Sequence, residues 1–246
     1  MIVIPMAGAS RRFAEAGYAR PKYELPLDGR TVFDHAVGGF QALFASEPFL
    51  FVVAGGEAAA FVEARAAALG VARAQVVSLD GPTAGQAETV SLGLAKAGAP
   101  AETPLTIFNI DTFRPGYRPP AGPLAAKDGW LEVFRGSGAN WSYVRPAPGG
   151  DPIALETAEK RPISDLCCTG LYHFARAADF AAALAAERAA PSMNELYVAP
   201  LYNHLIARGL RIGYRLIERD EVVFCGTPEE YRGLGGGPPG ETHDRR

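Results

Sequence analysis

The sequence predicts an α/β fold built on a parallel sheet. Two patterns in its first half support this prediction: short, continuous apolar runs alternate with alanine-rich stretches of helical periodicity, and small-residue or glycine-rich loops separate them. Continuous apolar runs indicate strands that are buried on both faces. Because a helical stretch follows each of the first three runs, we expect parallel strands with helices on both sides of the sheet.

The first half is expected to run strand–helix–strand–helix–strand–helix–strand. Met1–Met6 is an apolar run that ends in the small-residue loop Ala7–Ser10. Thr31 is placed to cap a helix whose apolar residues recur every three to four positions. The other elements expected in this half are strands at 49–53, 75–79 and 105–109 and helices at 58–69 and 83–97.

The second half is less regular. Residues 115–123 are rich in proline and glycine, which predicts a loop. Strands are expected at 130–134, 141–144, 153–157, 169–174, 211–217 and 221–225, and helices at 177–189 and 194–208. Because no repeat or linker interrupts the chain, we predict one domain over residues 1–232. A Gly/Pro-rich tail, 233–246, follows it and is expected to be disordered.

Composition excludes several classes of protein. The chain of 246 residues has 24 Lys+Arg and 27 Asp+Glu, a net charge of −3, so it lacks the basic character of a nucleic-acid or anionic-lipid binder. It has no signal-peptide pattern and no apolar run near the ~20 residues of a membrane span. Its three cysteines are too few for a disulfide framework or a zinc site. We expect a cytoplasmic protein without membrane insertion; whether it forms a homo-oligomer is left open.

The loop after the first strand is the first candidate site. A small-residue loop that ends a buried strand lets backbone N–H groups approach a phosphate closely. The loop lacks both GxxxxGK[ST] and GxGxxG, which excludes a P-loop and a dinucleotide fingerprint. Arg12 and Lys22 follow it, and two cations beside backbone donors suit a polyphosphate.

Two further segments point to the same edge of the sheet. Asp111 follows the fourth strand, and a carboxylate there lies in the crevice where open α/β sheets bind ligands. Gly85 and Gln86 lie at the start of the third helix, whose first amides are free to bind a ligand. The spatial convergence of these groups predicts a binding site for a phosphorylated ligand.

These segments, in this order, resemble the sugar-phosphate nucleotidyltransferase family. Gly8-Ala9-Ser10-Arg11-Arg12 stands where the family has G-x-G-[ST]-R, although Ser10 and Arg11 depart from that pattern, and Pro21-Lys22 stands at the place of its Pro-Lys. Further similar segments lie along nearly the whole chain: Gly81–Glu88, Phe108–Asp111, Glu159–Pro162, Thr169–Tyr172, Asn194–Pro200 and Cys225–Tyr231.

The resemblance implies a single Rossmann-like, GT-A-like three-layer α/β/α domain with a mixed, mainly parallel sheet. By resemblance, Arg12 contacts the triphosphate, Lys22 the transferred α-phosphate, and Asp111 binds Mg²⁺. The residues implied in nucleotide binding are Ala7, Gly8, Ala9, Ser10, Gly85 and Gln86. Those implied in acceptor binding are Glu159, Lys160, Gly170 and Glu195.

The activity implied is Mg²⁺-dependent transfer of a nucleoside monophosphate from an NTP to a small phosphorylated acceptor, with release of pyrophosphate. The short form of the family often serves capsule or lipopolysaccharide synthesis. A GT-A-like glycosyltransferase is an alternative, but it would use a D-x-D pair where this chain has Asn109-Ile110-Asp111. The second alternative is a nucleotide or nucleotide-sugar sensor without turnover. Many family members place a second metal-binding aspartate near the turn that corresponds to Cys225–Tyr231, the closing turn, and this chain has none there.

Overall fold

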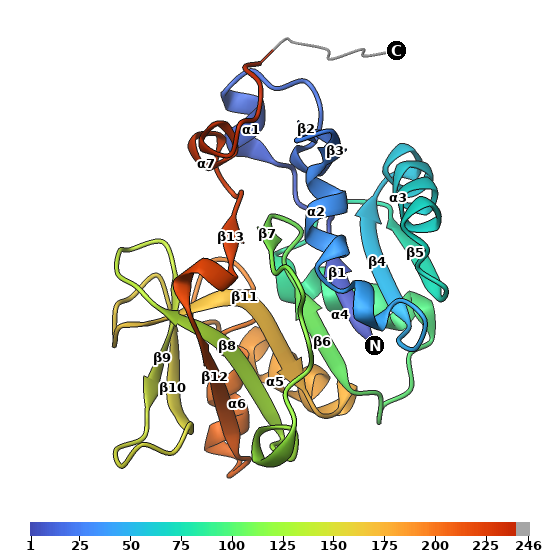
Figure 1. Ribbon diagram of the computed structural model, residues 1–246. Coiled ribbons are helices and arrows are strands. Elements are labelled where there is room, and N and C mark those ends of the chain that lie inside the picture. Colours follow the sequence, from blue (N-terminus) through green and yellow to red (C-terminus); the bar gives the residue numbers. More distant parts are fainter. Residues whose placement is uncertain (240–246) are drawn as a thin grey trace.

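A nine-stranded sheet runs through the computed structural model of the chain, in which residues 1–239 are described (Figure 1). The strand order is β10-β9-β11-β6-β1-β4-β5, and β8 pairs with β11 and β12. These strands are β1 Ile2–Pro5, β4 Phe49–Ala54, β5 Ala74–Leu79, β6 Leu105–Phe108, β8 Gly129–Arg135, β9 Ser142–Pro146, β10 Ala154–Glu159, β11 Leu166–Phe174 and β12 Ile212–Ile217. Two small ladders are separate from it: β2 (Pro26–Leu27) with β3 (Arg30–Thr31), and β7 (Thr112–Phe113) with β13 (Val223–Phe224).

The two halves of the large sheet differ in strand direction. β1 is parallel to β4 and β6, and β4 is parallel to β5, as the apolar runs of the first half predict. β11 is antiparallel to β6, β8 and β9, and β10 is antiparallel to β9. The predicted α/β class with a mixed sheet is therefore confirmed.

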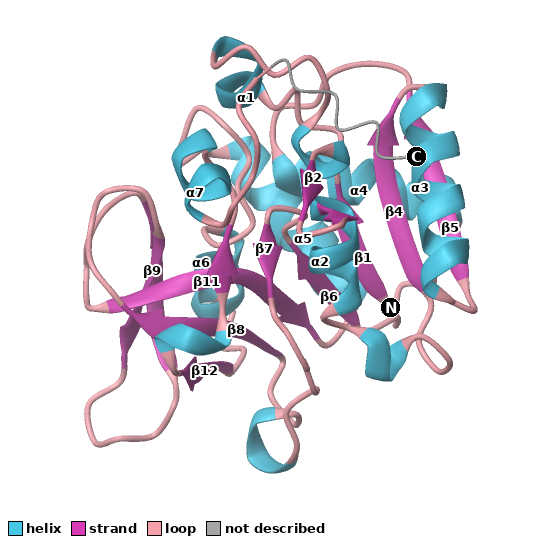
Figure 2. Cartoon of the chain, turned by 45° about the horizontal axis from the view of Figure 1, so that its top comes forward, coloured by secondary structure: helices cyan, strands magenta, loops and turns pink. Residues whose placement is uncertain are grey.

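Helices cover both faces of this sheet (Figure 2). The helices are α1 Arg11–Glu15, α2 Val32–Gly38, α3 Gly56–Leu69, α4 Gln86–Ala97, α5 Ala177–Ala189, α6 Leu201–Ala207 and α7 Pro228–Gly233. Neighbouring residues of β1 point to opposite sides: Ile4 packs in the core cluster that includes α2 and α3, and Val3 packs in the cluster that includes α4, α5 and α6. The layers are thus helix, sheet and helix, as expected.

The helix predicted at 194–208 is wrong in its first half. Only Leu201–Ala207 is helical, and Pro200 immediately precedes it. A proline disfavours helical dihedrals in the residue before it, which limits how far the helix extends toward the N-terminus. The residues ahead of it instead pair with the start of α4: the Leu196 N–H donates to the Ala84 carbonyl at 2.9 Å, and the Ala87 N–H donates to the Leu196 carbonyl at 2.8 Å.

The helix cap at Thr31 and the C-terminal tail are two further predicted features. Thr31 caps α2 as expected: its hydroxyl accepts from the Asp34 N–H at 3.2 Å, and the Asp34 carboxylate accepts from the Thr31 N–H at 2.8 Å. In the tail, the Tyr18 hydroxyl donates to the Gly237 carbonyl at 3.0 Å. Residues 240–246 lie outside the described residues, so a disordered tail stays a prediction. None of the helices within residues 1–239 is long and apolar enough to cross a membrane.

Candidate functional site

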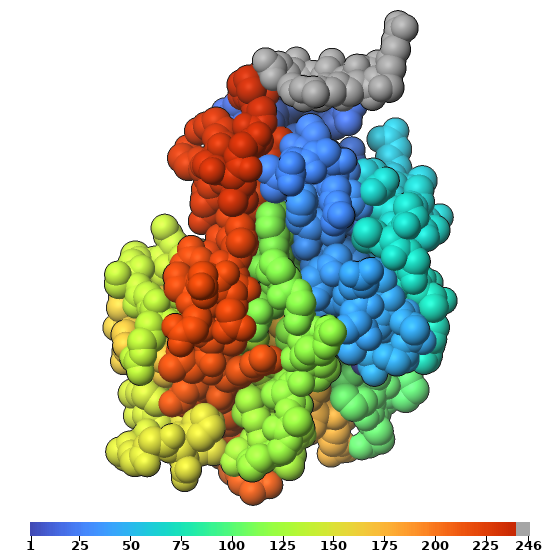
Figure 3. All heavy atoms as spheres, viewed as in Figure 1, coloured from blue at the N-terminus to red at the C-terminus, as the bar shows by residue number. Residues whose placement is uncertain are grey.

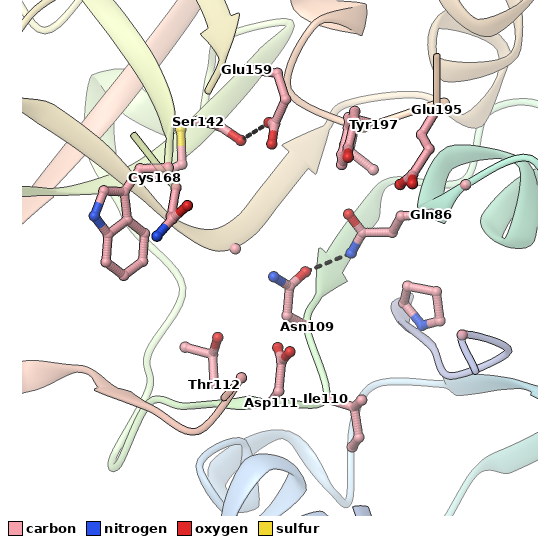
Figure 4. A pocket seen from close by; sticks show the side chains of 18 of the residues that line it. Gln86, Asn109, Ile110, Asp111, Thr112, Ser142, Glu159, Cys168, Glu195 and Tyr197 are labelled. Atoms are coloured by element: carbon pink, nitrogen blue, oxygen red, sulfur yellow. Dashed lines mark hydrogen bonds between the residues drawn. The ribbon is translucent and has the colours of Figure 1, made fainter. Parts of the chain in front are cut away.

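A cavity of about 820 Å³ opens where the carboxyl ends of β1 and β6 meet the start of α4 (Figure 4). Most of the candidate residues line it: Ala7, Gly8, Ala9, Arg12, Lys22, Gly85, Gln86, Asp111, Glu159, Gly170 and Glu195. Ser10 and Lys160 do not. Segments from both halves of the sheet therefore share one site.

Lys22 and Asp111 form an ion pair in this cavity. The Lys22 Nζ donates to the Asp111 Oδ2 at 2.5 Å, although the two residues are far apart in the chain. Burial raises the pKa of the Asp111 carboxyl, but the charge and hydrogen bond of Lys22, with smaller effects of a backbone hydrogen bond and of Arg12, together bring the pKa below its usual value. Asp111 is therefore ionised at neutral pH.

Gln86 and Asn109 lie near the middle of the cavity (Figure 4). The Gln86 Nε2 donates to the Asn109 Oδ1 at 2.5 Å, which joins the start of α4 to the end of β6. Gly170 of β11 makes room for this amide, because a Cβ there would lie 2.4 Å from the Asn109 Nδ2. The Gly170 φ of +94° also favours glycine. Asn109 was not among the predicted site residues, although its place beside Asp111 at a strand end could have indicated it.

Gly85 lets another segment approach α4. A Cβ at this position would lie 2.6 Å from the backbone nitrogen of Leu196, and its φ is +147°. The close approach brings the neighbouring Glu195 and Tyr197 into the lining of the cavity. Gly85 therefore lets the start of α4 and the segment around Leu196 line the cavity together.

Glu159 and Glu195 lie on the side of the cavity away from Asp111, near Tyr197 (Figure 4). Ser142 donates a hydrogen bond to Glu159. Burial raises the pKa of the Glu159 carboxyl, and the charge of Glu195 raises it further. Lys160 does not line the cavity, and its Nζ instead donates to the Tyr197 hydroxyl at 2.6 Å. The backbone φ of Lys160 is +54°.

Ser10 occupies a strained position at the start of α1. Its φ of 47° and ψ of 35° are left-handed, a conformation that glycine adopts at lower cost. Its side chain makes no capping hydrogen bond, and it lines a second cavity on the other side of the loop. A role of Ser10 in nucleotide binding stays a prediction.

The closing turn brings in a residue that the sequence analysis missed. The Cys225 N–H donates to the Asp111 carbonyl at 2.8 Å, which places the turn beside Asp111. Glu230 lines the cavity, and its Oε2 accepts from the Gly226 N–H at 2.8 Å and the Thr227 N–H at 3.0 Å. The pattern T-P-E-E predicts the capping role of this glutamate. Its place at the cavity depends on tertiary structure.

The carboxylate oxygens of Asp111 and Glu230 are suitable ligands for a divalent cation. A Cβ on Gly226 would lie 3.1 Å from the Asp111 Oδ2 and 3.7 Å from the Glu230 Oε2, so Gly226 leaves space between two carboxylates. Mg²⁺ is commonly bound by one or two carboxylates together with phosphate oxygens and water. Within residues 1–239 no group of three or more His, Cys, Asp or Glu side chains is arranged to hold a metal ion, so phosphates and water would supply the other ligands.

Comparison with solved structures decides the family. The chain is similar to the crystal structure of a nucleoside-diphosphate-sugar pyrophosphorylase from Vibrio cholerae RC9. The two share 50% sequence identity over 95% of this chain and 99% of that chain, with a TM-score of 0.91. The chain belongs to the sugar-phosphate nucleotidyltransferase family. This confirms the family that the sequence motifs resemble.

More distant nucleotidyltransferases share the fold. The inositol-1-phosphate CTP transferase from T. maritima has 15% identity over 95% of this chain and 94% of its own, with a TM-score of 0.70. A UDP-glucose pyrophosphorylase complexed with UDP-glucose has 16% identity over 95% of this chain and 96% of its own, with a TM-score of 0.73. Comparison with protein-family models and with curated proteins gave no match.

Proposed function

We propose that this nucleotidyltransferase transfers a nucleoside monophosphate from an NTP to a small phosphorylated acceptor and releases pyrophosphate. An acceptor phosphate oxygen forms a bond to the α-phosphorus, and the bond from the α-phosphorus to the pyrophosphate oxygen breaks. An acceptor phosphate is already ionised near pH 7, so the reaction needs charge neutralisation and alignment more than proton transfer.

The convergence of Lys22 and Asp111 at the end of β6 is the observation that carries this proposal. Their 2.5 Å pair lies in the same cavity as Arg12 and the backbone of the Gly8 loop. Arg12 and the loop amides bind the triphosphate, and Lys22 exchanges its carboxylate partner for an oxygen of the α-phosphate. Asp111, with Glu230 nearby, would hold Mg²⁺, which supplies positive charge to the phosphates.

The two sides of the cavity divide the substrates. Gly85 and Gln86 at the start of α4 bind the nucleoside, and Glu159, Gly170 and Glu195 line the acceptor side. Lys160 reaches the acceptor phosphate if its ammonium leaves the Tyr197 hydroxyl. The cytoplasmic location, which was expected from the sequence itself, stays a prediction, as does the role in capsule or lipopolysaccharide precursor synthesis that the resemblance implies. Whether the chain self-associates stays open.

Pyrophosphate release tests this function. The purified chain is incubated with Mg²⁺, each common NTP in turn and a panel of sugar phosphates and other small phosphorylated acceptors. A parallel incubation replaces the NTP with nucleotide sugars. The proposal expects release that requires both an NTP and one class of acceptor. Release of a nucleoside diphosphate from a nucleotide sugar, without pyrophosphate formation, would instead support the glycosyltransferase alternative. Nucleotide binding without turnover on any acceptor would support the sensor alternative.

A further inference from the structure

A short ladder carries Asp111 at one end and a buried arginine at the other. β7 and β13 pair over Thr112↔Phe224 and Phe113↔Val223. The Cys225 N–H closes one end on the Asp111 carbonyl at 2.8 Å. In the space-filling view, the closing segment in red lies against the green segment that follows β6 (Figure 3). A two-stranded ladder of this length is marginal alone, so something must hold it.

Arg114 holds the other end of that ladder. Its guanidinium donates from Nη1 to the Glu221 carbonyl at 3.1 Å and from Nη2 to the Glu221 Oε1 at 3.1 Å. Its Nε donates to the Glu132 Oε1 at 2.8 Å. The planar, five-donor fork of arginine suits this three-way contact, which a lysine ammonium cannot reproduce in the same geometry.

Glu132 fixes Arg114 to the large sheet. It lies on β8, its side chain is 0% exposed, and that of Arg114 is 3% exposed. Glu132 Oε1 also lies 3.4 Å from the hydroxyl of Thr169, a residue of β11 that lines the active-site cavity. The pair therefore connects the ladder to β11, a strand whose residues line the cavity.

The pair is a costly way to obtain stability. The Glu132 Oε2 is buried and has no hydrogen-bond partner among the described residues; the Arg215 Nη1 lies 3.8 Å away. Buried ion pairs often contribute no more to stability than apolar residues of similar volume, because desolvating two charges offsets their attraction. What apolar residues cannot supply is the fixed direction of the arginine fork.

We infer that Arg114 and Glu132 are positioning residues that set the place of Asp111 and the closing turn through the β7–β13 ladder. This inference rests on the proposed function for its catalytic consequence. The ladder itself can be tested without turnover, because Cys225 at its end is fully buried and reports local opening. Cys167 and Cys168 are also buried and serve as internal controls.

The test replaces the pair together, in R114M/E132L. Thermal unfolding, pulse labelling of each cysteine with a thiol reagent followed by mass spectrometry, and steady-state kinetics are compared with wild type. We expect unchanged or higher thermal stability and labelling of Cys225 that is about tenfold faster, with Cys167 and Cys168 unaffected. We also expect kcat to fall by about tenfold or more while the KM for the NTP changes little.

Labelling of Cys225 at the wild-type rate would overturn the inference, as would unchanged kcat in an active enzyme. If R114M/E132L does not fold, R114K keeps a cation beside Glu132 but loses the fork. It must then show faster Cys225 labelling with wild-type thermal stability, and a wild-type labelling rate in R114K overturns the inference. Absence of pyrophosphate release from the wild type would contradict the proposed function, whereas the labelling rates would still decide the role of the pair.

Discussion

The Lys22 Nζ lies 2.5 Å from the Asp111 Oδ2, so the two side chains neutralise each other in the absence of ligands. Lys22 is the proposed phosphate contact and Asp111 the proposed metal ligand. Nucleotide binding on this account exchanges one ion pair for two, in which Lys22 contacts phosphate and Asp111 contacts the cation. The pair also prevents an unpaired charge from lying in a partly buried site, which would be costly. Burial and the Lys22 ammonium have opposite effects on the pKa of Asp111, and this balance can be measured.

Lys22→Met should raise the pKa of the Asp111 carboxyl. In the wild type, burial raises that pKa, and Lys22 makes the largest of the opposing contributions, which together lower it below its usual value. Removing the ammonium leaves burial opposed only by weaker contacts, so the folded-state pKa rises. The ¹³C shift of the Asp111 carboxyl, followed by NMR titration in both proteins, gives the two values. Equal values would mean that the pair does not control Asp111.

Glu230→Gln should weaken metal binding with little effect on folding. A glutamine oxygen can still accept from the Gly226 and Thr227 N–H groups, so the cap of α7 is retained. The lost charge faces the space beside Asp111, and we expect about tenfold weaker binding of Mn²⁺ in the presence of pyrophosphate, measured by electron paramagnetic resonance.

Glu229→Gln is the matched control for that experiment. Its carboxylate is exposed and bonds Arg232 at 3.2 Å, away from the cavity. Equal Mn²⁺ affinities for the two variants would exclude Glu230 from the metal site.

Gly85→Ala should damage both the fold and the active site. The added methyl carbon would lie 2.6 Å from the Leu196 backbone, so the segment that carries Glu195 must move. Overpacking of this kind costs about 1–3 kcal/mol, measurable by urea unfolding. Gly81→Ala is the control, because its Cβ would meet nothing within 4 Å. If Gly85→Ala unfolds at the same urea concentration as Gly81→Ala, the close approach is not a constraint.

His173 should make the fold sensitive to acid. Burial, with a smaller effect of the N-terminal ammonium, lowers its pKa to about 4. A depressed histidine pKa means that the neutral form is favoured in the folded state. The contribution of this pKa difference to the free energy of unfolding is thus complete above the unfolded-state pKa near 6.5, and it is lost as the pH falls toward 4. Between pH 7 and 4.5 this loss is about 2–3 kcal/mol.

His173→Phe removes the titrating group and keeps a ring against Trp130, on which the histidine stacks. The free energy of unfolding of this variant should fall less over the same pH range. Parallel curves for variant and wild type would show that His173 does not titrate in this way.

The strands and helices of the first half could be predicted because β1, β4 and β6 are buried on both faces, and such continuous apolar runs carry a local signal. The edge strand β5 is partly exposed but still carries a short apolar run. The pairing of β8, β9 and β11 could not, since antiparallel partners in this half are chosen by contacts between distant segments. Pro200 makes the helix predicted at 194–208 begin only at Leu201, and this proline is a local signal in the sequence.

The site residues also divide into those that a local sequence signal predicts and those that depend on tertiary structure. Gly8 and Asp111 follow the ends of β1 and β6, and strand ends in an α/β sheet converge, so their meeting follows from topology. Lys22 lies beyond α1 and is brought to Asp111 by the path of the loop. The direction of the Lys160 side chain depends on a φ of +54°, and the room for Asn109 depends on Gly170 of another strand. Neither relation has a local signal, and Glu230 reaches the cavity only because the β7–β13 ladder brings the closing turn to Asp111.

The central claim is that Lys22 and Asp111 act on the transition state of nucleotidyl transfer. Its most direct test is pyrophosphate release by wild type, Lys22→Ala and Asp111→Asn, with NTP affinity measured separately by calorimetry. We predict that each variant lowers kcat/KM by about 10²–10³, or 2.7–4 kcal/mol, while NTP affinity falls only a few-fold because Arg12 and the loop amides remain. Losses of NTP affinity as large as the losses of kcat/KM, or wild-type turnover in either variant, would contradict the claim.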